Sequence, residues 1–272
     1  LYHLQDAGLS CPEEEMTRPV IGLLEKKAWA CLILMGIGLA VFYPLLDAGV
    51  IDLDDTPMIR SLADPDRQHF YKKLFFPADT PRYYRPLLMA SFILDAGIWQ
   101  LEYSGYHLTN ILIHLASALI FYLICRGFFL HGSAGADRYR QVPFFLALTF
   151  LVHPLCVESV AWISGRTDLM SAFFVLAGFL FYRSDLRLKA VFTGVCFLLG
   201  LLCKENALFL APAVMLHAGC AGSASDGKKA GVARAAVWAA VLSAPMAVYL
   251  FMRFSGPFLF KKVVQAGPVA IK

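Results

Sequence analysis

Charged residues are scarce in this sequence. Asp, Glu, Lys and Arg make up 16% of its 272 residues, whereas 58% are hydrophobic. About a quarter of the residues of a soluble domain are charged, so the composition predicts an all-α polytopic membrane protein. The net charge of +4 comes from basic residues that stand at the ends of apolar runs and form no patch. We therefore expect no nucleic acid partner.

Cysteine pairs and internal repeats are missing as well. The seven cysteines include no C-x-x-C pair and stand mostly inside apolar runs, which is typical of small core residues and excludes a disulfide framework or a zinc site. The apolar run at 28–46 is too long for a signal peptide, and no small-residue cleavage pattern follows it. Because the sequence begins without Met and stops in a loop-like stretch, we expect it to be part of a longer protein.

Long apolar runs, in contrast, are plentiful and predict about seven transmembrane helices. They lie at about 28–46, 105–125, 143–157, 168–182, 190–203, 206–217 and 234–252. The expected organisation is an N-terminal tail (1–27), a first transmembrane helix (28–46), a first outer loop (47–104), transmembrane helices two to seven (105–252) and the start of another outer loop (253–272).

The segment 86–99 is apolar but is too short to cross a bilayer and carries Asp95 in its middle. A helix lying at the membrane interface fits these features better than a crossing. The distribution of Lys and Arg agrees, because without a crossing here the basic segments all fall on the side of the N-terminal tail. The N-terminus is therefore predicted to be cytoplasmic, with the loop 47–104 outside.

Two adjacent carboxylates, Asp54 and Asp55, follow the first predicted span. An Asp-Asp-Thr-Pro sequence is also typical of a solvated turn at the start of a helix. A carboxylate at the membrane boundary can instead act as a base toward a hydroxyl group. Its neighbour could orient the acceptor or hold a divalent metal, so Asp55 is a possible metal ligand.

Three basic residues, Arg85, Arg166 and Lys204, are predicted to lie at the same outer level. A guanidinium or an ammonium group there can bind a phosphate. Simpler roles stay open: Arg85 could anchor the interfacial helix, Arg166 could pair with Asp168, and Lys204 could pair with Glu205.

The second span begins with a polar stripe along one helix face, at His107, Asn110, His114 and Ser117. Such a stripe either joins helices by hydrogen bonds or lines a substrate cavity. The spacing of His153 and Glu158 is not that of metal ligands on a helix, which makes zinc improbable there. The residues predicted to line a substrate cavity are His107, His114, His153, Glu158, Asp168 and Glu205.

These motifs, in this order, resemble the membrane half of the transmembrane and tetratricopeptide-repeat-containing O-mannosyltransferases and their bacterial relatives, which belong to the GT-C glycosyltransferases. The resemblance covers about residues 50–215. It rests on Asp54-Asp55, Tyr84-Arg85-Pro86-Leu87, Tyr106-His107-Leu108, Asn110, His114, His153-Pro154, Glu158, Gly165-Arg166 and Leu202-Cys203-Lys204-Glu205. It implies a GT-C-like helix bundle with its site in the first outer loop, where the acidic pair of the family falls on Asp54 and Asp55. The tetratricopeptide repeats are expected downstream of this sequence.

The resemblance implies an inverting glycosyltransferase that moves mannose or another hexose from a polyprenyl-phosphate donor to Ser or Thr of an exported protein. Asp54 is the expected base, and Arg85, Arg166 and Lys204 are the expected phosphate ligands. No cofactor is certain, and membrane lipid and the lipid-linked sugar are the expected partners. The expected location is a bacterial inner membrane, with the site on the periplasmic side. Two alternatives remain: a GT-C transferase acting on a glycan or lipid acceptor, and a non-catalytic transporter of lipid phosphate or solute.

Overall fold

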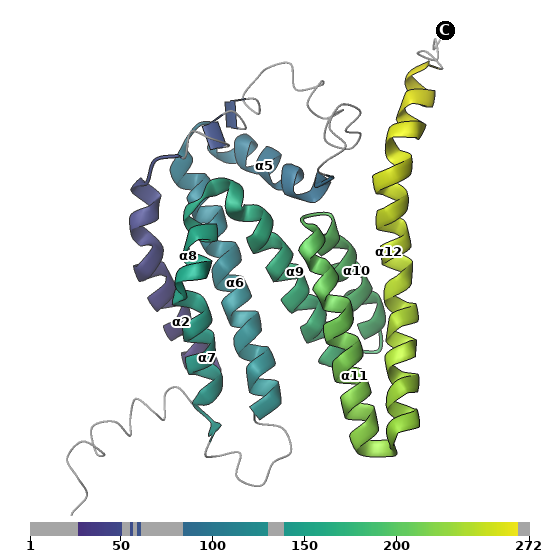
Figure 1. The fold of residues 1–272 in the computed structure, drawn as a ribbon. Coiled ribbons are helices and arrows are strands. Elements are labelled where there is room, and N and C mark those ends of the chain that lie inside the picture. Colours follow the sequence, from purple (N-terminus) through teal and green to yellow (C-terminus); the bar gives the residue numbers. More distant parts are fainter. Residues whose placement is uncertain (1–26, 51–54, 57–58, 61–83, 130–138, 266–272) are drawn as a thin grey trace, which may run out of the picture.

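The computed structural model describes residues 27–50, 55–56, 59–60, 84–129 and 139–265, with side chains described up to residue 254. Every regular element in these residues is a helix (Figure 1). In chain order they are α2 (Lys27–Phe42), η2 (Tyr43–Asp47), α5 (Pro86–Trp99), α6 (Tyr103–Phe129), α7 (Val142–Val152), α8 (Pro154–Ala161), η4 (Ile163–Gly165), α9 (Arg166–Arg183), α10 (Lys189–Leu201), η5 (Glu205–Phe209), α11 (Leu210–Asp226) and α12 (Lys228–Gln265).

Five helical segments in the described part of the chain are long and apolar enough to cross a membrane. They are Lys27–Asp47, Tyr103–Phe129, Ile163–Arg183, Glu205–Asp226 and Lys228–Phe254. A sixth crossing is obtained if α7 and α8, which meet at an angle of 50°, form one bent span. The prediction of an all-α polytopic membrane protein is confirmed.

The predicted fifth span, at about 190–203, corresponds to α10, which has only 13 residues. At about 1.5 Å per residue it extends roughly 20 Å, less than the ~30 Å hydrocarbon core of a bilayer. It packs between α9 and α12, so neighbouring helices cover much of its length. The count of seven crossings stays a prediction.

Helix α5 has the bounds that the sequence predicted for the interfacial helix, because Pro86 provides its first residue. A proline is well suited to the first helical position, where its missing N–H costs no hydrogen bond. In Figure 1, α5 lies across one end of the bundle and is steeply inclined to the long helices. We call this end of the molecule the α5 end.

Apolar side chains form three buried clusters. One joins α2, α6 and α7 through residues such as Leu34, Leu115 and Leu151. A second lies among α9, α10, α11 and α12. The third fixes α5 to the ends of α6 and α9 through Phe92, Tyr106 and Met170. Because α5 has its own buried face, its position on the bundle is determined by packing.

The last helix, α12, extends further along the chain than the sequence predicted. The sequence analysis ended the last span at 252 and expected residues 253–272 to begin an outer loop, but α12 continues to Gln265. The apolar run Gly256 to Phe260 resumes after Arg253 and Ser255, so the two polar positions do not end the helix. The extension carries Arg253 on a rigid element toward the α5 end.

Candidate functional site

Polar side chains from several helices gather at the α5 end. In Figure 1 this end receives the last residues of α2, α8 and α10 and the first residues of α6, α9 and η5. The chain thus passes this end repeatedly, and each passage supplies one or two ionisable groups. They form three groups of ion pairs.

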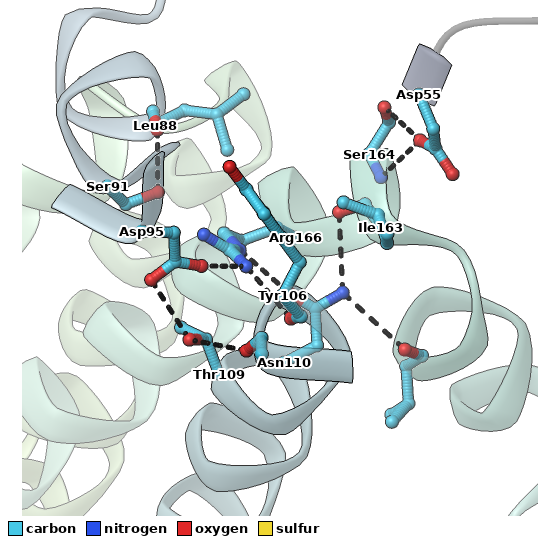
Figure 2. Close-up of polar contacts among 12 residues, drawn as sticks. Asp55, Leu88, Ser91, Asp95, Tyr106, Thr109, Asn110, Ile163, Ser164 and Arg166 are labelled. Carbon is cyan, nitrogen blue, oxygen red and sulfur yellow. Dashed lines mark hydrogen bonds and ion pairs between the residues drawn. The ribbon is translucent and has the colours of Figure 1, made fainter. Parts of the chain in front are cut away.

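The first group is a buried network around Arg166, the first residue of α9 (Figure 2). Its Nη2 atom lies 2.6 Å from Asp95 Oδ2, in an ion pair whose side chains are 0% and 7% exposed. Its Nε donates to Asn110 Oδ1 at 2.7 Å, and Nη2 also donates to the Tyr106 carbonyl at 3.0 Å. Thr109 Oγ1 donates to the other oxygen of Asp95 at 3.0 Å. The guanidinium therefore joins α5, α6 and α9.

Sequence analysis offered Arg166 either as a phosphate ligand or as the partner of Asp168. The second alternative is wrong, because Asp95 takes the ion pair. The guanidinium is fully buried and packs 4.3 Å from the centre of the Phe92 ring. In this structure none of its surface is open to a ligand, and its geometry fits positioning of helices better than direct phosphate contact.

Gly165 allows the tight turn that precedes Arg166. A Cβ atom at this position would lie 2.6 Å from the Ser159 carbonyl oxygen and 2.9 Å from Ser159 Cα. No side chain fits at such distances, so the approach of η4 to α8 requires glycine. This explains the Gly-Arg motif in physical terms: the glycine lets the chain turn, and the turn places the arginine.

Asp55 reaches the same turn from the other side (Figure 2). Its Oδ1 accepts hydrogen bonds from the Ser164 backbone N–H at 2.9 Å and from the Ser164 hydroxyl at 2.5 Å. The residue is 1% exposed. One member of the predicted acidic pair therefore lies beside the Arg166 network, while Asp54 lies outside the described residues.

The second group is the ion pair between Lys204 and Asp168, whose Nζ and Oδ1 atoms are 2.5 Å apart. Sequence analysis had offered Glu205 as the partner of Lys204, which is wrong. Lys204 has extended backbone at the break between α10 and η5, and this conformation directs it toward the first turn of α9. Its side chain is 24% exposed and that of Asp168 is 41% exposed, so the pair is accessible.

The third group surrounds Glu205. Arg253 Nη1 donates to Glu205 Oε1 at 2.6 Å and to the Tyr249 hydroxyl at 2.7 Å. Arg85 Nη2 lies 3.6 Å from Glu205 Oε2. The backbone of Leu87 also donates to the Leu202 carbonyl at 3.3 Å. Arg85 and Lys204 are thereby brought into one neighbourhood, since Lys204 and Glu205 are adjacent.

A cavity of about 330 Å³ lies beside the Lys204–Asp168 pair, between α6, α8, α9 and η5. Its polar lining comes from His114, Ser117, Ser159, Asp168, Ser171 and Asn206. Leu155 and Phe209, which also line it, are 78% and 71% exposed. The cavity therefore opens at an exposed apolar part of the bundle surface.

The polar stripe of α6 joins helices by hydrogen bonds, and part of it also lines the cavity beside Asp168. Asn110 Nδ2 donates to the carbonyl oxygens of Trp162 and Ile163 at 3.1 and 3.3 Å. His114 Nε2 lies 2.9 Å from the Leu151 carbonyl oxygen and also lines the cavity. His107 is 1% exposed and lies against the backbone of Ala48 and Gly49.

His153 and Glu158 are not where the cavity prediction placed them. His153 stands at the bend between α7 and α8, where its Nδ1 accepts from the Leu155 N–H at 3.2 Å and caps α8. Both side chains are exposed, and neither lines the cavity. The helix resumes after His153 as α8, at an angle of 50° to α7, so His153 stands at the bend between two helices and not in an outer loop.

Three further findings bear on the chemistry of the site. Burial raises the pKa of the Cys203 thiol to about 12, so this thiol stays neutral at physiological pH. Burial also raises the pKa of Tyr84, helped by the nearby Tyr249. Within the described residues no group of three or more His, Cys, Asp or Glu side chains could hold a metal ion.

Four contributors to the site were missed by sequence reasoning: Asp95, Asn110, Ser164 and Arg253. Asp95 offered the clearest signal, because a carboxylate in the middle of an apolar helix requires a partner. Asn110 belonged to the recognised stripe without an assigned partner. Arg253 lay beyond the expected end of the last span, and nothing about Ser164 distinguishes it in the sequence.

Protein O-mannosyl-transferase Tmtc3 of Drosophila melanogaster is 32% identical over 152 residues, which are 47% of this chain and 16% of the fly protein. Protein O-mannosyl-transferase TMTC3 of Mus musculus is 33% identical over 132 residues, 46% of this chain and 13% of the mouse protein. The chain is a relative of these proteins.

A relative of lower sequence identity has a similar name. Protein O-mannosyl-transferase F38B6.6 of Caenorhabditis elegans is 26% identical over 143 residues, which cover 53% of this chain and 20% of the worm protein. The chain thus spans at most about a fifth of the length of these curated relatives. No family model matches the chain. No solved structure matches it either.

Proposed function

We propose that the chain is the membrane part of a glycosyltransferase that moves a sugar from a polyprenyl-phosphate donor to a Ser or Thr hydroxyl of an exported protein. Its TMTC relatives are named protein O-mannosyl-transferases. The observation that carries the proposal is the gathering of Asp55, Lys204, Arg85 and Arg253 at one end of the bundle, beside a cavity that opens toward lipid.

Lys204, Arg85 and Arg253 are the proposed ligands of the donor phosphate. Each carries accessible side-chain surface, with 24%, 21% and 24% exposed. Each also faces a carboxylate in this structure, so the donor phosphate would replace Asp168 or Glu205 as the counterion. Arg166 takes a positioning role instead of the direct contact that its motif implied, because it is fully buried.

The cavity beside Asp168 is the proposed place for the first units of the lipid chain. Apolar walls from Phe150, Leu169 and Val175 suit an isoprenoid, and the exposed Leu155 and Phe209 mark its opening toward the membrane. A lipid phosphate entering from this side would reach Lys204 first. The cavity is thus arranged to receive an amphipathic donor from the bilayer.

Asp54 is the proposed base, with Asp55 fixing the turn beside it. The acceptor hydroxyl transfers its proton to the carboxylate of Asp54 while its oxygen forms a bond to the anomeric carbon. The bond between that carbon and the phosphate oxygen breaks, and the lipid phosphate leaves with the electron pair. A phosphate needs little protonation to leave, so one base and a cationic clamp supply what a glycosidase obtains from two carboxyl groups.

The proposed membrane orientation follows the positive-inside rule, which places the α5 end on the exoplasmic side. Most of each TMTC relative lies outside the matched segment. Acceptor recognition by tetratricopeptide repeats downstream therefore remains part of the proposal, as does dependence on a divalent metal at Asp55.

The test is sugar transfer in proteoliposomes, with radiolabelled polyprenyl-phosphate mannose and a Ser/Thr-rich acceptor peptide. Asp54→Asn should lower the transfer rate by at least about 100-fold, the lower range for loss of a general base. Glu102→Gln is the matched control, because this carboxylate is exposed at the same end of the bundle. Full transfer by the Asp54 variant would refute the proposed base.

Donor binding is measured separately. Lys204→Gln and Arg85→Gln should raise the KM for the donor by about tenfold or more, since hydrogen bonds to charged groups contribute ~1.5–3 kcal/mol. Arg187→Gln, exposed in the loop between α9 and α10, should leave it unchanged. Unchanged donor KM in the Lys204 and Arg85 variants would contradict the phosphate assignment. Addition of a chelator in the same assay tests whether sugar transfer depends on a divalent metal.

A further inference from the structure

A second polar cavity lies at the opposite end of the bundle from α5. It has a volume of about 580 Å³ and is formed by the end of α9, the start of α10, and the facing parts of α11 and α12. Three basic side chains line it: Arg183, Lys189 and Arg234. We call it the basic pocket. It shares no lining residue with the cavity beside Asp168.

The positive charge of the basic pocket is only partly balanced. Arg234 pairs with Asp226 and donates to Ser225 Oγ at 3.3 Å. Lys189 makes no ion pair within the described part of the chain. Arg183 faces no carboxylate there either: Nη2 donates to the Gly127 carbonyl at 3.0 Å, while Nη1 is buried without a hydrogen-bond partner among the described residues. The pocket therefore retains an excess of positive charge.

Aromatic groups give the basic pocket a fixed shape. The Arg183 guanidinium lies 3.8 Å from the centre of the Phe128 ring. The Tyr182 hydroxyl is 2.8 Å from His217 Nδ1, and Trp238 meets the Tyr182 ring edge-on at 4.8 Å. These contacts place the cationic groups on rigid helices and not on mobile loops. A pocket held in this way needs little reorganisation to receive an anion.

The outer rim of the basic pocket is apolar. Val237 lines the pocket and is 60% exposed, and Trp238 beside it is partly exposed. Tryptophan is typical of the boundary between lipid and water. A ligand that combines an anionic group with an apolar stem would therefore meet charge inside the pocket and lipid-facing side chains at its rim.

We propose that the basic pocket binds the phosphate group of an anionic membrane lipid. Basic pockets between transmembrane helices are known to receive such head groups on the cytoplasmic side, and the α9–α10 loop is one of the segments rich in Lys and Arg. The bound lipid joins α9, α10, α11 and α12 at the end where α10 begins. Free phosphate shares the same chemistry, so the experiment must separate the two sources.

The experiment is native mass spectrometry of the detergent-purified chain, titrated with phosphatidylglycerol or with phosphatidylcholine. The wild type should retain phosphatidylglycerol in preference to phosphatidylcholine. The variant Lys189→Gln/Arg234→Gln should bind phosphatidylglycerol at least about tenfold more weakly. The control Lys228→Gln/Lys229→Gln removes the same charge from exposed positions at the start of α12 and should keep the wild-type affinity.

Arg183 is left unchanged in these variants because it also holds the end of α6. Thermal unfolding with each lipid provides a second readout: phosphatidylglycerol should raise the Tm of the wild type and of the control variant only. Equal retention of both lipids by the wild type would overturn the proposal. So would a loss of phosphatidylglycerol binding in the control variant as large as the loss in Lys189→Gln/Arg234→Gln. If inorganic phosphate alone raises the Tm and phosphatidylglycerol is not preferred, the lipid is not the ligand.

Discussion

At the scale of the residue, the site depends on a buried charge. Arg166 and Asp95 pair inside the protein, and the guanidinium also donates through Nε to Asn110 and through Nη2 to the Tyr106 carbonyl. Such a pair contributes little net stability compared with apolar residues, but removing one partner leaves an uncompensated buried charge. The pair is therefore best understood as a device that permits only one arrangement of α5, α6 and α9.

The single variant Arg166→Gln is expected to lower the free energy of unfolding by about 3–5 kcal/mol, because the Asp95 carboxylate stays buried without its counterion. The double variant Arg166→Gln/Asp95→Asn should lose less than the sum of the two single variants. Thermal unfolding in detergent micelles measures all three. Arg234→Gln breaks an ion pair whose side chains are 51% and 54% exposed and should cost only about 0–1 kcal/mol.

A loss of stability in the double variant equal to the sum of the losses in the two single variants would contradict this account. Such additivity would indicate that Arg166 and Asp95 do not interact in the folded protein. Restored stability in the double variant, together with lost sugar transfer, would separate the structural role of the pair from its contribution to the site.

At the scale of the element, the turn between α8 and α9 positions both Ser164 and Arg166. Gly165 lies against the backbone of Ser159, where the nearest atom to a Cβ is a carbonyl oxygen and not a flexible side chain. A larger residue must therefore displace the backbone, and the displacement would be passed on to Asp55 through Ser164.

Gly165→Ala is accordingly expected to destabilise the protein by about 1–3 kcal/mol, the range for overpacking, and to abolish transfer. Gly36→Ala is the matched control: it lies in α2, and a Cβ there would meet no atom within 4 Å. Because glycine within a helix costs roughly 0.5–1 kcal/mol relative to alanine, the control should unfold at the same or a higher temperature. A Gly165 variant as active and stable as the control would show that the turn tolerates a side chain.

Several elements could be predicted from the sequence because their signals are local. The bounds of α5 follow from Pro86 and from the length of its apolar run, and the break between α7 and α8 falls at His153-Pro154. The helix that follows this break could not be predicted in the same way. The predicted span 143–157 ends where α8 has only begun, and nothing in the sequence specifies the angle of 50° between α7 and α8.

The partners in the ion pairs could not be predicted from local sequence signals. Sequence analysis placed Arg166, Asp168, Lys204 and Glu205 at one level, but paired neighbours along the chain. In the structure Arg166 pairs with Asp95 and Lys204 pairs with Asp168. The partner is decided by which helices pack together, and apolar helices carry no pattern that specifies their neighbours.

At the scale of the whole molecule, the two ends of the helix bundle differ in their balance of charge. One end carries balanced acid–base groups beside a cavity that opens toward lipid, whereas the other carries the basic pocket with excess positive charge. Helix α9 connects the two, because Arg166 begins it and Arg183 ends it. Because α9 belongs to a segment long and apolar enough to cross a membrane, this arrangement places the two proposed sites at opposite membrane faces.

Cysteine labelling tests this placement. Glu102, in the connection between α5 and α6, and Asp185, in the connection between α9 and α10, are both exposed. Between them the chain passes through α6, the bent pair α7–α8, and α9. Three crossings place Glu102→Cys and Asp185→Cys on opposite sides of the membrane, whereas a re-entrant α7–α8 pair leaves two crossings and places them on the same side.

We expect an impermeant maleimide to label Glu102→Cys from the exoplasmic side of intact cells, and Asp185→Cys only after the membrane is opened. The background replaces Cys11, Cys31, Cys156 and Cys220 by Ser and keeps the buried Cys125, Cys196 and Cys203; it should stay unlabelled. Cys203 remains in this background because it is fully buried and its thiol, with a pKa raised to about 12, forms almost no thiolate at pH 7. Labelling of both introduced cysteines from one side would contradict the placement of the two sites at opposite membrane faces. Lipid of the cytoplasmic leaflet could then not be the ligand of the basic pocket while the α5 end faces outward.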